Sequence, residues 1–151
     1  MAQILTSEEF DLSDPEQYHD WTDITLRYGD EDRMGHINNA SYVTFFEASR
    51  VPILDSFLDG DHIDFVMARM TTDYLRETSF PGVVRVGGRG LRFGTKSFTS
   101  GYGLFRDGLC LATAVSVNVF FDTKTRGSAS PTPAQKSRVE EFMRTGMKPQ
   151  R

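Results

Sequence analysis

Residues 39–50 read NASYVTFFEASR, and their apolar side chains recur at helical spacing. A helix over this stretch would place on one face Tyr42, Phe45, Phe46 and Ser49. Glu47 and Arg50 would point elsewhere. The stretch therefore predicts a helix that buries an aromatic face.

The sequence also marks both ends of this helix. Asn39 and Ser41 can each cap a helix N-terminus, so the helix should begin near them. Pro52 would clash with the Ala48 carbonyl, so we expect a kink or break there, before Phe57.

Strands are expected on either side of the helix. Residues 21–28 alternate between apolar and polar side chains and predict a first strand. Beyond Asp64 the period changes, which predicts four further strands over residues 65–75, 83–93, 97–105 and 109–121. Short turn-like segments join these strands, including Phe80-Pro-Gly82 and the hairpin signal Asp107-Gly108. Such connections indicate an antiparallel meander.

The last predicted strand and the segment after it have clear patterns. In the strand, one face carries Val115, Val117, Val119 and Phe121, and the other carries Ala114, Ser116 and Asn118. A final helix should start after Ser130 with Pro131 or Pro133 in its first turn. Its apolar residues are Val139, Phe142 and Met143.

The order strand, helix, four strands, helix predicts an α+β architecture in which a sheet wraps around one buried helix. No internal repeat or linker divides the chain. We expect an N-terminal lead-in over residues 1–20, a single domain over 21–145 and a C-terminal tail over 146–151.

Composition narrows the class of protein. The chain has 151 residues, of which 38% are hydrophobic and 25% charged, as in one globular domain. It has no apolar run of the roughly 20 residues that a membrane span needs, and residues 1–20 do not resemble a signal peptide. A single cysteine, Cys110, cannot form an internal disulfide and is expected in the core. These features predict a cytoplasmic protein that does not bind membranes.

The net charge of −4 argues against nucleic acid as a partner, but the charges are unevenly distributed. Residues 1–33 contain ten acids, whereas residues 82–106 contain five bases and no acid. The bases are Arg85, Arg89, Arg92, Lys96 and Arg106. This strip could hold a phosphorylated small molecule, or its charges could simply face solvent on strands.

The densest polar cluster, residues 27–42, joins the first predicted strand to the aromatic helix. The first N–H groups of a helix lack intrahelical partners and can stabilise an oxyanion. Asp32 and His36 lie close together there, and Gly35 permits a tight turn. A carboxylate in this position can attack a carbonyl or activate water.

Structural roles for the same residues stay open. Asn38, Asn39 and Ser41 could simply be caps, residues 30–32 could be a solvated acidic loop, and His36 could be a hydrogen-bonded structural residue. Three scattered histidines without ligand spacing predict no metal site. The segment Gly87-Gly-Arg-Gly90 lies within a strand pattern, so it indicates bulges or a close backbone approach rather than a phosphate loop.

Several motifs resemble those of the hot-dog-fold acyl-CoA thioesterases, and more narrowly the 4-hydroxybenzoyl-CoA thioesterase family. They are Asp30-Glu-Asp32, Gly35-His-Ile-Asn-Asn39, Tyr42, Phe46-Glu-Ala-Ser-Arg50, Asp73-Tyr-Leu75, Phe80-Pro-Gly82, Gly94-Thr-Lys-Ser-Phe98 and Val119-Phe-Phe-Asp122. The similarity covers about residues 20–145. It implies the hot-dog fold, an antiparallel sheet wrapped around a central helix, with a C-terminal helix.

The resemblance also implies roles for the loop. Asp32 would attack the thioester carbonyl or act as general base for water, and the Asn39 backbone N–H would be the oxyanion donor. Gly35 is the loop glycine of the motif. The loop is also similar to that of plant acyl-carrier-protein thioesterases, which implies an assisting role for His36. Those enzymes have an Asn two residues after the Asp, where this chain has Met34.

For substrate binding, the resemblance implies an acyl pocket lined by Tyr42 and Phe46. It implies that the coenzyme A phosphates are contacted by Lys96 and Ser97, and more weakly by Arg92 and Arg126. The substrate would be an acyl-CoA or acyl-carrier-protein thioester, with no cofactor. The family forms homodimers or homotetramers, with the site between protomers.

Two other functions remain open. Hot-dog enoyl-CoA hydratases also place an Asp and a His before the helix, but their signature has Asn-Pro between them, and Asp32-Arg-Met-Gly-His36 does not. A non-catalytic acyl-CoA-binding module could keep the same fold, because fold alone does not establish activity.

Overall fold

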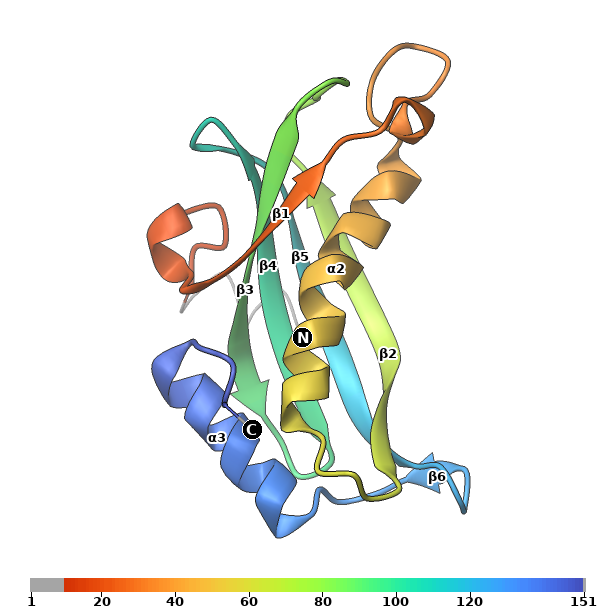
Figure 1. Cartoon of the computed structure of the whole chain (residues 1–151), viewed down its shortest axis with the longest axis vertical. Coiled ribbons are helices and arrows are strands. Elements are labelled where there is room, and N and C mark those ends of the chain that lie inside the picture. Colours follow the sequence, from red (N-terminus) through yellow and green to blue (C-terminus); the bar gives the residue numbers. More distant parts are fainter. Residues whose placement is uncertain (1–9, 151) are drawn as a thin grey trace.

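A computed structural model describes residues 10–150 of the chain (Figure 1). The antiparallel sheet contains β1 (Asp20–Thr25), β2 (Ile63–Tyr74), β3 (Val83–Phe93), β4 (Ser97–Arg106), β5 (Leu109–Asp122) and the short β6 (Gly127–Ser128). Its helices are α2 (Asn39–Phe57), α3 (Pro133–Thr145) and the 3-10 turns η1 (Pro15–Gln17) and η2 (Tyr28–Asp30). The sheet curls along one side of α2, so the predicted α+β architecture is confirmed (Figure 1).

The strand order corrects the predicted meander. The sheet runs β1-β3-β4-β5-β2, with β6 pairing β5, so of the five predicted strands only β3, β4 and β5 are joined by consecutive hairpins. β2 pairs with β5, from Ile63 opposite Asp122 to Tyr74 opposite Ala112. Residues 75–82, which contain the predicted turn Phe80-Pro-Gly82, therefore form a crossing connection between two strands that are not neighbours. The first strand is also shorter than predicted, because the chain leaves it after Thr25 and turns at η2.

Helix α2 begins where the sequence predicts, with the Asn38 side chain accepting from the Ala40 N–H at 2.9 Å. The predicted break at Pro52 is wrong, because the helix continues to Phe57. Pro52 is exposed on the side of α2 that faces away from the sheet, where solvent can bond the freed carbonyl of Ala48. Buried side chains beyond the proline hold the last turn against the sheet, namely Ile53, Leu54 and Phe57.

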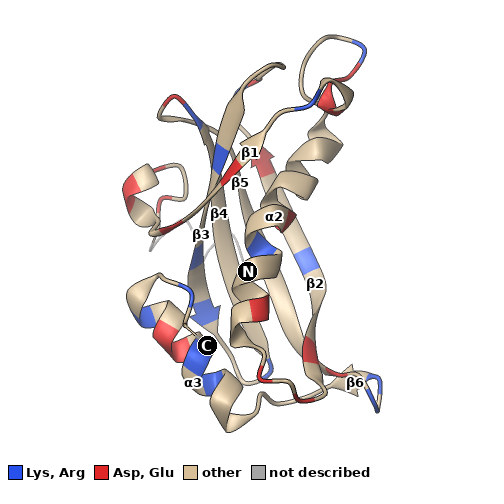
Figure 2. Cartoon of the chain, viewed as in Figure 1, with Lys and Arg blue, Asp and Glu red and all other residues tan. Residues whose placement is uncertain are grey.

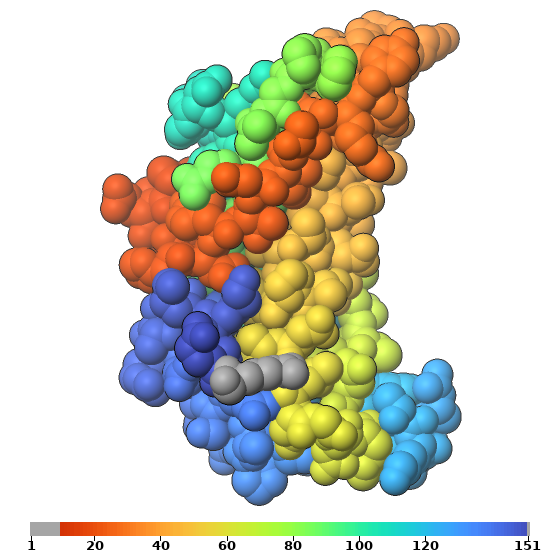
Figure 3. All heavy atoms as spheres, in the orientation of Figure 1, coloured from red at the N-terminus to blue at the C-terminus, as the bar shows by residue number. Residues whose placement is uncertain are grey.

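The aromatic face of α2 is buried as predicted, with Phe45 and Phe46 at most 3% exposed. The Arg50 side chain is 12% exposed and pairs with Glu47, with 3.5 Å between Nη2 and Oε2. Its Nε is buried and, among residues 10–150, has no hydrogen-bond partner. Figure 3 shows the opposite side of α2 uncovered at the front of the molecule.

The face of β5 that turns toward α2 is the small and polar one. Ala114, Ser116 and Asn118 are at most 2% exposed, whereas the valines on the other face are less buried. Asn118 Nδ2 donates to the Phe98 carbonyl at 2.9 Å and to Ser100 Oγ at 3.1 Å. Small side chains leave room for the aromatic residues of α2, and the buried polar groups satisfy one another.

Glycines let the N-terminal segment lie directly on the outer face of the sheet. A Cβ on Gly103 would come within 2.6 Å of the Leu12 carbonyl oxygen, and one on Gly87 would collide with the Tyr18 ring. Leu12 and Tyr18 are buried there together with Cys110. The prediction of bulges or a close approach at residues 87–90 is confirmed, because the Tyr18 side chain lies against Gly87 and the register of β3 with β4 shifts between Gly90 and Arg92. Cys110 is a core residue as expected.

Helix α3 closes the end of the molecule opposite the start of α2 (Figure 1). It starts at Pro133 after the cap Thr132, and its Phe142 ring packs edge-on against Phe57 and Phe98, with ring centroids 5.6 and 6.1 Å apart. The predicted final helix and its apolar residues are confirmed. Among residues 10–150, no helix combines the length and apolar character needed to cross a membrane.

Candidate active site

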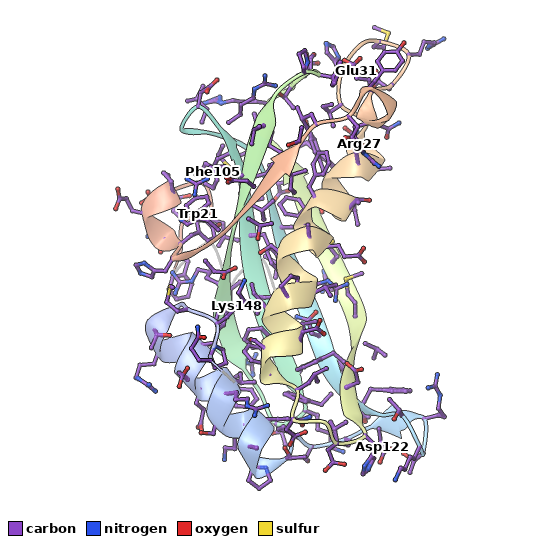
Figure 4. The ribbon with its side chains drawn as sticks, viewed as in Figure 1. Trp21, Arg27, Glu31, Phe105, Asp122 and Lys148 are labelled. Carbon is purple, nitrogen blue, oxygen red and sulfur yellow. The ribbon has the colours of Figure 1, made fainter. Side chains whose placement is uncertain are left out.

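The loop between η2 and α2, residues 31–38, is closed on itself by backbone hydrogen bonds. The Asn38 N–H donates to the Asp30 carbonyl, and the Asp32 N–H to the His36 carbonyl, each at 2.8 Å. Gly35 sits at the turn with a φ of 79°, a backbone conformation that favours glycine. The loop projects from one end of the molecule, where Figure 4 labels Glu31. It therefore holds the exposed side chains of residues 32–34 in a defined geometry, while Ile37 is buried in the core.

Asp32 is exposed and is anchored by one carboxylate oxygen only. Its Oδ1 accepts from the Met34 N–H at 2.8 Å and from the His36 N–H at 3.2 Å. Within the described residues, Oδ2 has no hydrogen-bond partner. The loop thus fixes the orientation of the carboxylate while leaving one oxygen available for chemistry.

Asp30 contrasts with Asp32, and the alternative of a solvated acidic loop over residues 30–32 does not hold for it. Asp30 is 2% exposed, and its carboxylate accepts from the backbone N–H and the Nη2 of Arg27, each at 2.8 Å. The hydrogen bond from the Arg27 side chain holds the pKa of this carboxyl below its usual range. Asp30 therefore supports the loop from beneath and is not available to a substrate.

Replacing Asp30 with Asn is expected to destabilise the fold at neutral pH. Each hydrogen bond to a charged group contributes about 1.5–3 kcal/mol, so a loss of that order in the free energy of unfolding is expected. Because the folded pKa is depressed, the wild-type advantage is present above the unfolded pKa of about 3.9 and is lost as the pH falls through the folded pKa. Urea unfolding of both proteins at pH 7 and at about pH 3 measures this difference; an advantage that persists at acid pH would contradict the assignment.

The N-terminus of α2 lies directly behind the loop. Asn38 caps the Ala40 N–H, and the Ser41 N–H donates to the Asn38 carbonyl at 2.9 Å. Among residues 10–150, no acceptor meets the Asn39 N–H. An unpaired donor in the first helical turn, where the helix dipole is positive, can stabilise an oxyanion.

Tyr74 is a residue of the site to which the sequence analysis assigned no role, although it belongs to the motif Asp73-Tyr-Leu75. Its Oη donates to the Asn39 carbonyl at 3.0 Å, and its ring packs on Tyr42 with centroids 5.2 Å apart. Burial raises the pKa of the Tyr42 hydroxyl, and the nearby Tyr74 and Glu77 raise it further. Tyr74 lies 35 residues after Asn39, so no local signal in the sequence could have placed it there.

Glu77 is a second such residue. It lies in the connection after β2, and its Oε2 is 3.3 Å from His36 Nε2. His36 is partly exposed and Glu77 largely exposed, so solvent screens this pair. A carboxylate in this position can orient the imidazole ring.

Other predicted site residues lie apart from the loop in a single chain. Phe46 is fully buried in the core, where its ring packs against Tyr102 with centroids 6.0 Å apart. Lys96, Ser97 and Arg92 surround the β3–β4 turn, at the end of the sheet opposite the start of α2 (Figure 1). In one chain, therefore, the structure brings together Asp32, Gly35, His36, Asn39 and Tyr42.

Figure 2 shows basic positions along β3. The bases of the strip at residues 82–106 differ in whether they have partners. Arg85 Nε donates to Asp23 at 2.8 Å and its guanidinium stacks on Trp21, while Arg89 stacks on Phe10. Arg92 and Lys96 are exposed and, in the part of the chain that the structure describes, form no ion pair. Only part of the strip is thus available to a phosphate-bearing ligand.

Comparison with known proteins agrees with this architecture. The profile of the Thioesterase-like superfamily matches residues 26–145. A predicted thioesterase from Bacillus stearothermophilus has 29% sequence identity and a TM-score of 0.75, over 80% of this chain and 93% of that one. A thioesterase from Thermus thermophilus, solved with coenzyme A and Zn, has 26% identity and a TM-score of 0.73, over 81% of this chain and 98% of that one.

A third structure, the PA5185 protein from Pseudomonas aeruginosa, has 26% identity and a TM-score of 0.75, over 83% of this chain and 92% of that one. A search of curated protein sequences gave no match. The profile spans most of the chain, and the thioesterase structures share its curled sheet, central helix and C-terminal helix. The chain has the hot-dog fold and belongs to the Thioesterase-like superfamily.

Proposed function

We propose that this chain hydrolyses an acyl-CoA or acyl-carrier-protein thioester to the free acid and the thiol. The main support for the proposal is that the site offers two groups: the exposed carboxylate of Asp32, which its loop holds in place, and the Asn39 N–H at the start of α2, which has no acceptor among residues 10–150. Membership of the Thioesterase-like superfamily supports it, as does the coenzyme A bound to the related Thermus thioesterase.

In the proposed reaction, Asp32 takes a proton from water as the water oxygen attacks the thioester carbonyl. The Asn39 N–H then donates a hydrogen bond to the oxyanion that forms. The C–S bond breaks, the acid is released and the thiolate takes up the proton. In the covalent variant, Asp32 itself attacks the carbonyl and water hydrolyses the resulting anhydride. A single turnover in ¹⁸O water separates the two routes, because only the covalent one can leave ¹⁸O on Asp32.

The first experiment is thiol release from a panel of acyl-CoAs by the wild type beside Asp32→Asn. The panel should include aromatic, short, branched and long acyl groups, together with an acyl-carrier-protein thioester. Release that depends on Asp32 supports the proposal and identifies the preferred acyl class. Absence of release from every thioester, by a folded protein, would contradict it.

Cys110 is expected not to disturb this assay. The thiol is 8% exposed, and burial raises its pKa to about 11, so at pH 8 about one in 10³ of the thiols is ionised. An aromatic disulfide reagent should therefore show no rapid reaction with the native chain, but one thiol per chain in denaturant. A stoichiometric burst from native protein would contradict the burial of Cys110.

We further propose that the active unit is a homodimer or homotetramer with its site between protomers. β2 is an edge strand that exposes Val66, Met67 and Tyr74, each 44% accessible. Antiparallel pairing of two such edges would bring the β3–β4 turn of one copy toward the loop of the other. In that arrangement Lys96, Ser97 and Arg92 of the partner could contact the phosphates of the substrate.

Subunit mixing tests this arrangement. Asp32→Asn and Lys96→Glu should each impair activity alone, the first in kcat and the second in KM. After unfolding and refolding together, mixed dimers would contain one intact site and recover up to about half of the wild-type activity per mixed dimer. No recovery, in mixtures shown to exchange subunits, would place Asp32 and Lys96 in separate functions or in the same chain's site.

A further inference from the structure

The connection between β2 and β3, residues 75–82, supports the loop that carries Asp32. The Ile37 N–H donates to the Thr78 carbonyl and Ser79 Oγ donates to the Gly35 carbonyl, each at 2.8 Å. Gly35 and Ile37 flank His36, whose ring pairs with Glu77 of the same connection. The geometry of the Asp32 loop therefore depends on where this connection lies.

Arg106, at the end of β4, holds the connection from its other side. Its Nη1 donates to Thr78 Oγ1 at 2.9 Å and to the Ser79 carbonyl at 2.7 Å, and its Nη2 donates to the Pro81 carbonyl at 2.7 Å. The planar guanidinium serves three acceptors that diverge along the connection, which the point charge of a lysine cannot do. Arg106 is half-buried, and the hairpin that carries it lies at the same end of the molecule as the start of α2 (Figure 1).

Gly82 shows that the chain makes room for this guanidinium. Its φ is 144°, and a Cβ at this position would collide with the guanidinium of Arg106. The Gly82 carbonyl also accepts from the Leu26 N–H at 2.8 Å, next to the segment that leads into η2. Arg106 therefore holds residues 78–81 of the connection, and Gly82 fixes the end of the connection where β3 begins.

We propose that Arg106 is a positioning residue for hydrolysis at the Asp32 site. Its guanidinium holds residues 78–81, and these residues hold the loop that presents Asp32 and His36. Arg106 hydrogen-bonds to residues 78–81, and these residues in turn hydrogen-bond to the Asp32 loop. Arg106 therefore acts through other residues and does not touch the substrate. This inference rests on the thioesterase function proposed above.

The test compares Arg106→Ala with Arg85→Ala on the substrate that the panel identifies. Arg85 is a matched control because its guanidinium is also fixed on this sheet, by Asp23 and Trp21, but does not contact the connection. A misplacement of about 1 Å can cost about 10²-fold, so kcat of Arg106→Ala should fall by about 10- to 100-fold, with KM changing much less. Arg85→Ala should keep its kcat.

Rescue separates positioning from loss of stability. Guanidinium ion, added below the concentration that unfolds the chain, should restore part of the kcat of Arg106→Ala by occupying the vacated site. It should not raise the activity of the wild type or of Arg85→Ala. A variant that is merely unstable would lose activity on this addition, because guanidinium is a denaturant. If Arg106→Ala does not fold, Arg106→Lys keeps the stem and the charge but lacks the fork, and the same fall in kcat is expected.

A double-mutant cycle with Ser79→Ala tests the route. If Arg106 acts through this connection, the fall in kcat caused by Ser79→Ala should not multiply with the fall caused by Arg106→Ala. The double variant should then resemble Arg106→Ala alone. Multiplicative losses, or an unchanged kcat in Arg106→Ala, would overturn the inference. Amide exchange at Ile37 provides a readout if no thioester is hydrolysed: lost protection in Arg106→Ala but not in Arg85→Ala supports the holding role, and unchanged protection overturns it.

Discussion

Replacing Asp32 with Ala is expected to lower thioester turnover by at least about 10²-fold, because a positioned general base typically contributes about 10²–10⁴-fold. The carboxylate is exposed, and its hydrogen bonds are confined to the N–H groups of Met34 and His36 in its own loop. Thermal unfolding should therefore change little. Steady-state thiol release and a melting curve, measured on the same preparation, check both expectations.

The matched control is Asp14→Ala. Asp14 also accepts from a nearby backbone N–H, that of Glu16 at 2.9 Å, but it precedes η1, which lies on the side of the molecule away from β2 (Figure 1). Turnover in this variant should match that of the wild type. An Asp32→Ala protein that is folded and fully active would remove Asp32 from the mechanism, and equal losses in both variants would indicate a general charge effect.

The residues that could be predicted for the site are those that one short loop brings together. Asp32, Gly35, His36 and Asn39 lie within eight residues of sequence, so their proximity follows from local structure. Tyr74 reaches the same place at the end of β2, and Glu77 and Ser79 reach it because the connection after β2 folds back over the loop. No periodicity or turn signal encodes such a contact, since it depends on the order of the strands.

The strand order, like those contacts, could not be predicted from the sequence pattern. The alternation of apolar residues located β3, β4 and β5 almost to the residue, because each has a period of two between turn signals. It could not show that β2 pairs with β5, because edge pairing depends on which strands still have unpaired backbone groups once the hairpins have closed. The prediction of a break at Pro52 is wrong for a related reason. The free-energy cost of a proline inside a helix depends on whether solvent reaches the carbonyl that loses its hydrogen bond.

For Phe46, the sequence resemblance and the structure predict different effects of a substitution. The family resemblance implies that it lines an acyl pocket, whereas in the chain its side chain is fully buried among core residues that include Tyr102. Phe46→Ala is therefore expected to destabilise the fold by about 3–5 kcal/mol, the usual cost of removing a buried phenylalanine ring. Urea unfolding with a common m-value measures this loss.

The exposed side of the same helix provides the comparison. Val43→Ala removes an apolar side chain that is 40% exposed on α2, and it should cost well under about 1.5 kcal/mol. If Phe46→Ala instead keeps its stability and changes the preferred acyl length, the ring faces a pocket formed with a second protomer, and its burial in one chain is not its main contribution. A large loss of stability with an unchanged order of substrate preference would place Phe46 in the core. The acyl pocket would then begin nearer Tyr42 and Tyr74, whose rings pack together beside the Asn39 carbonyl.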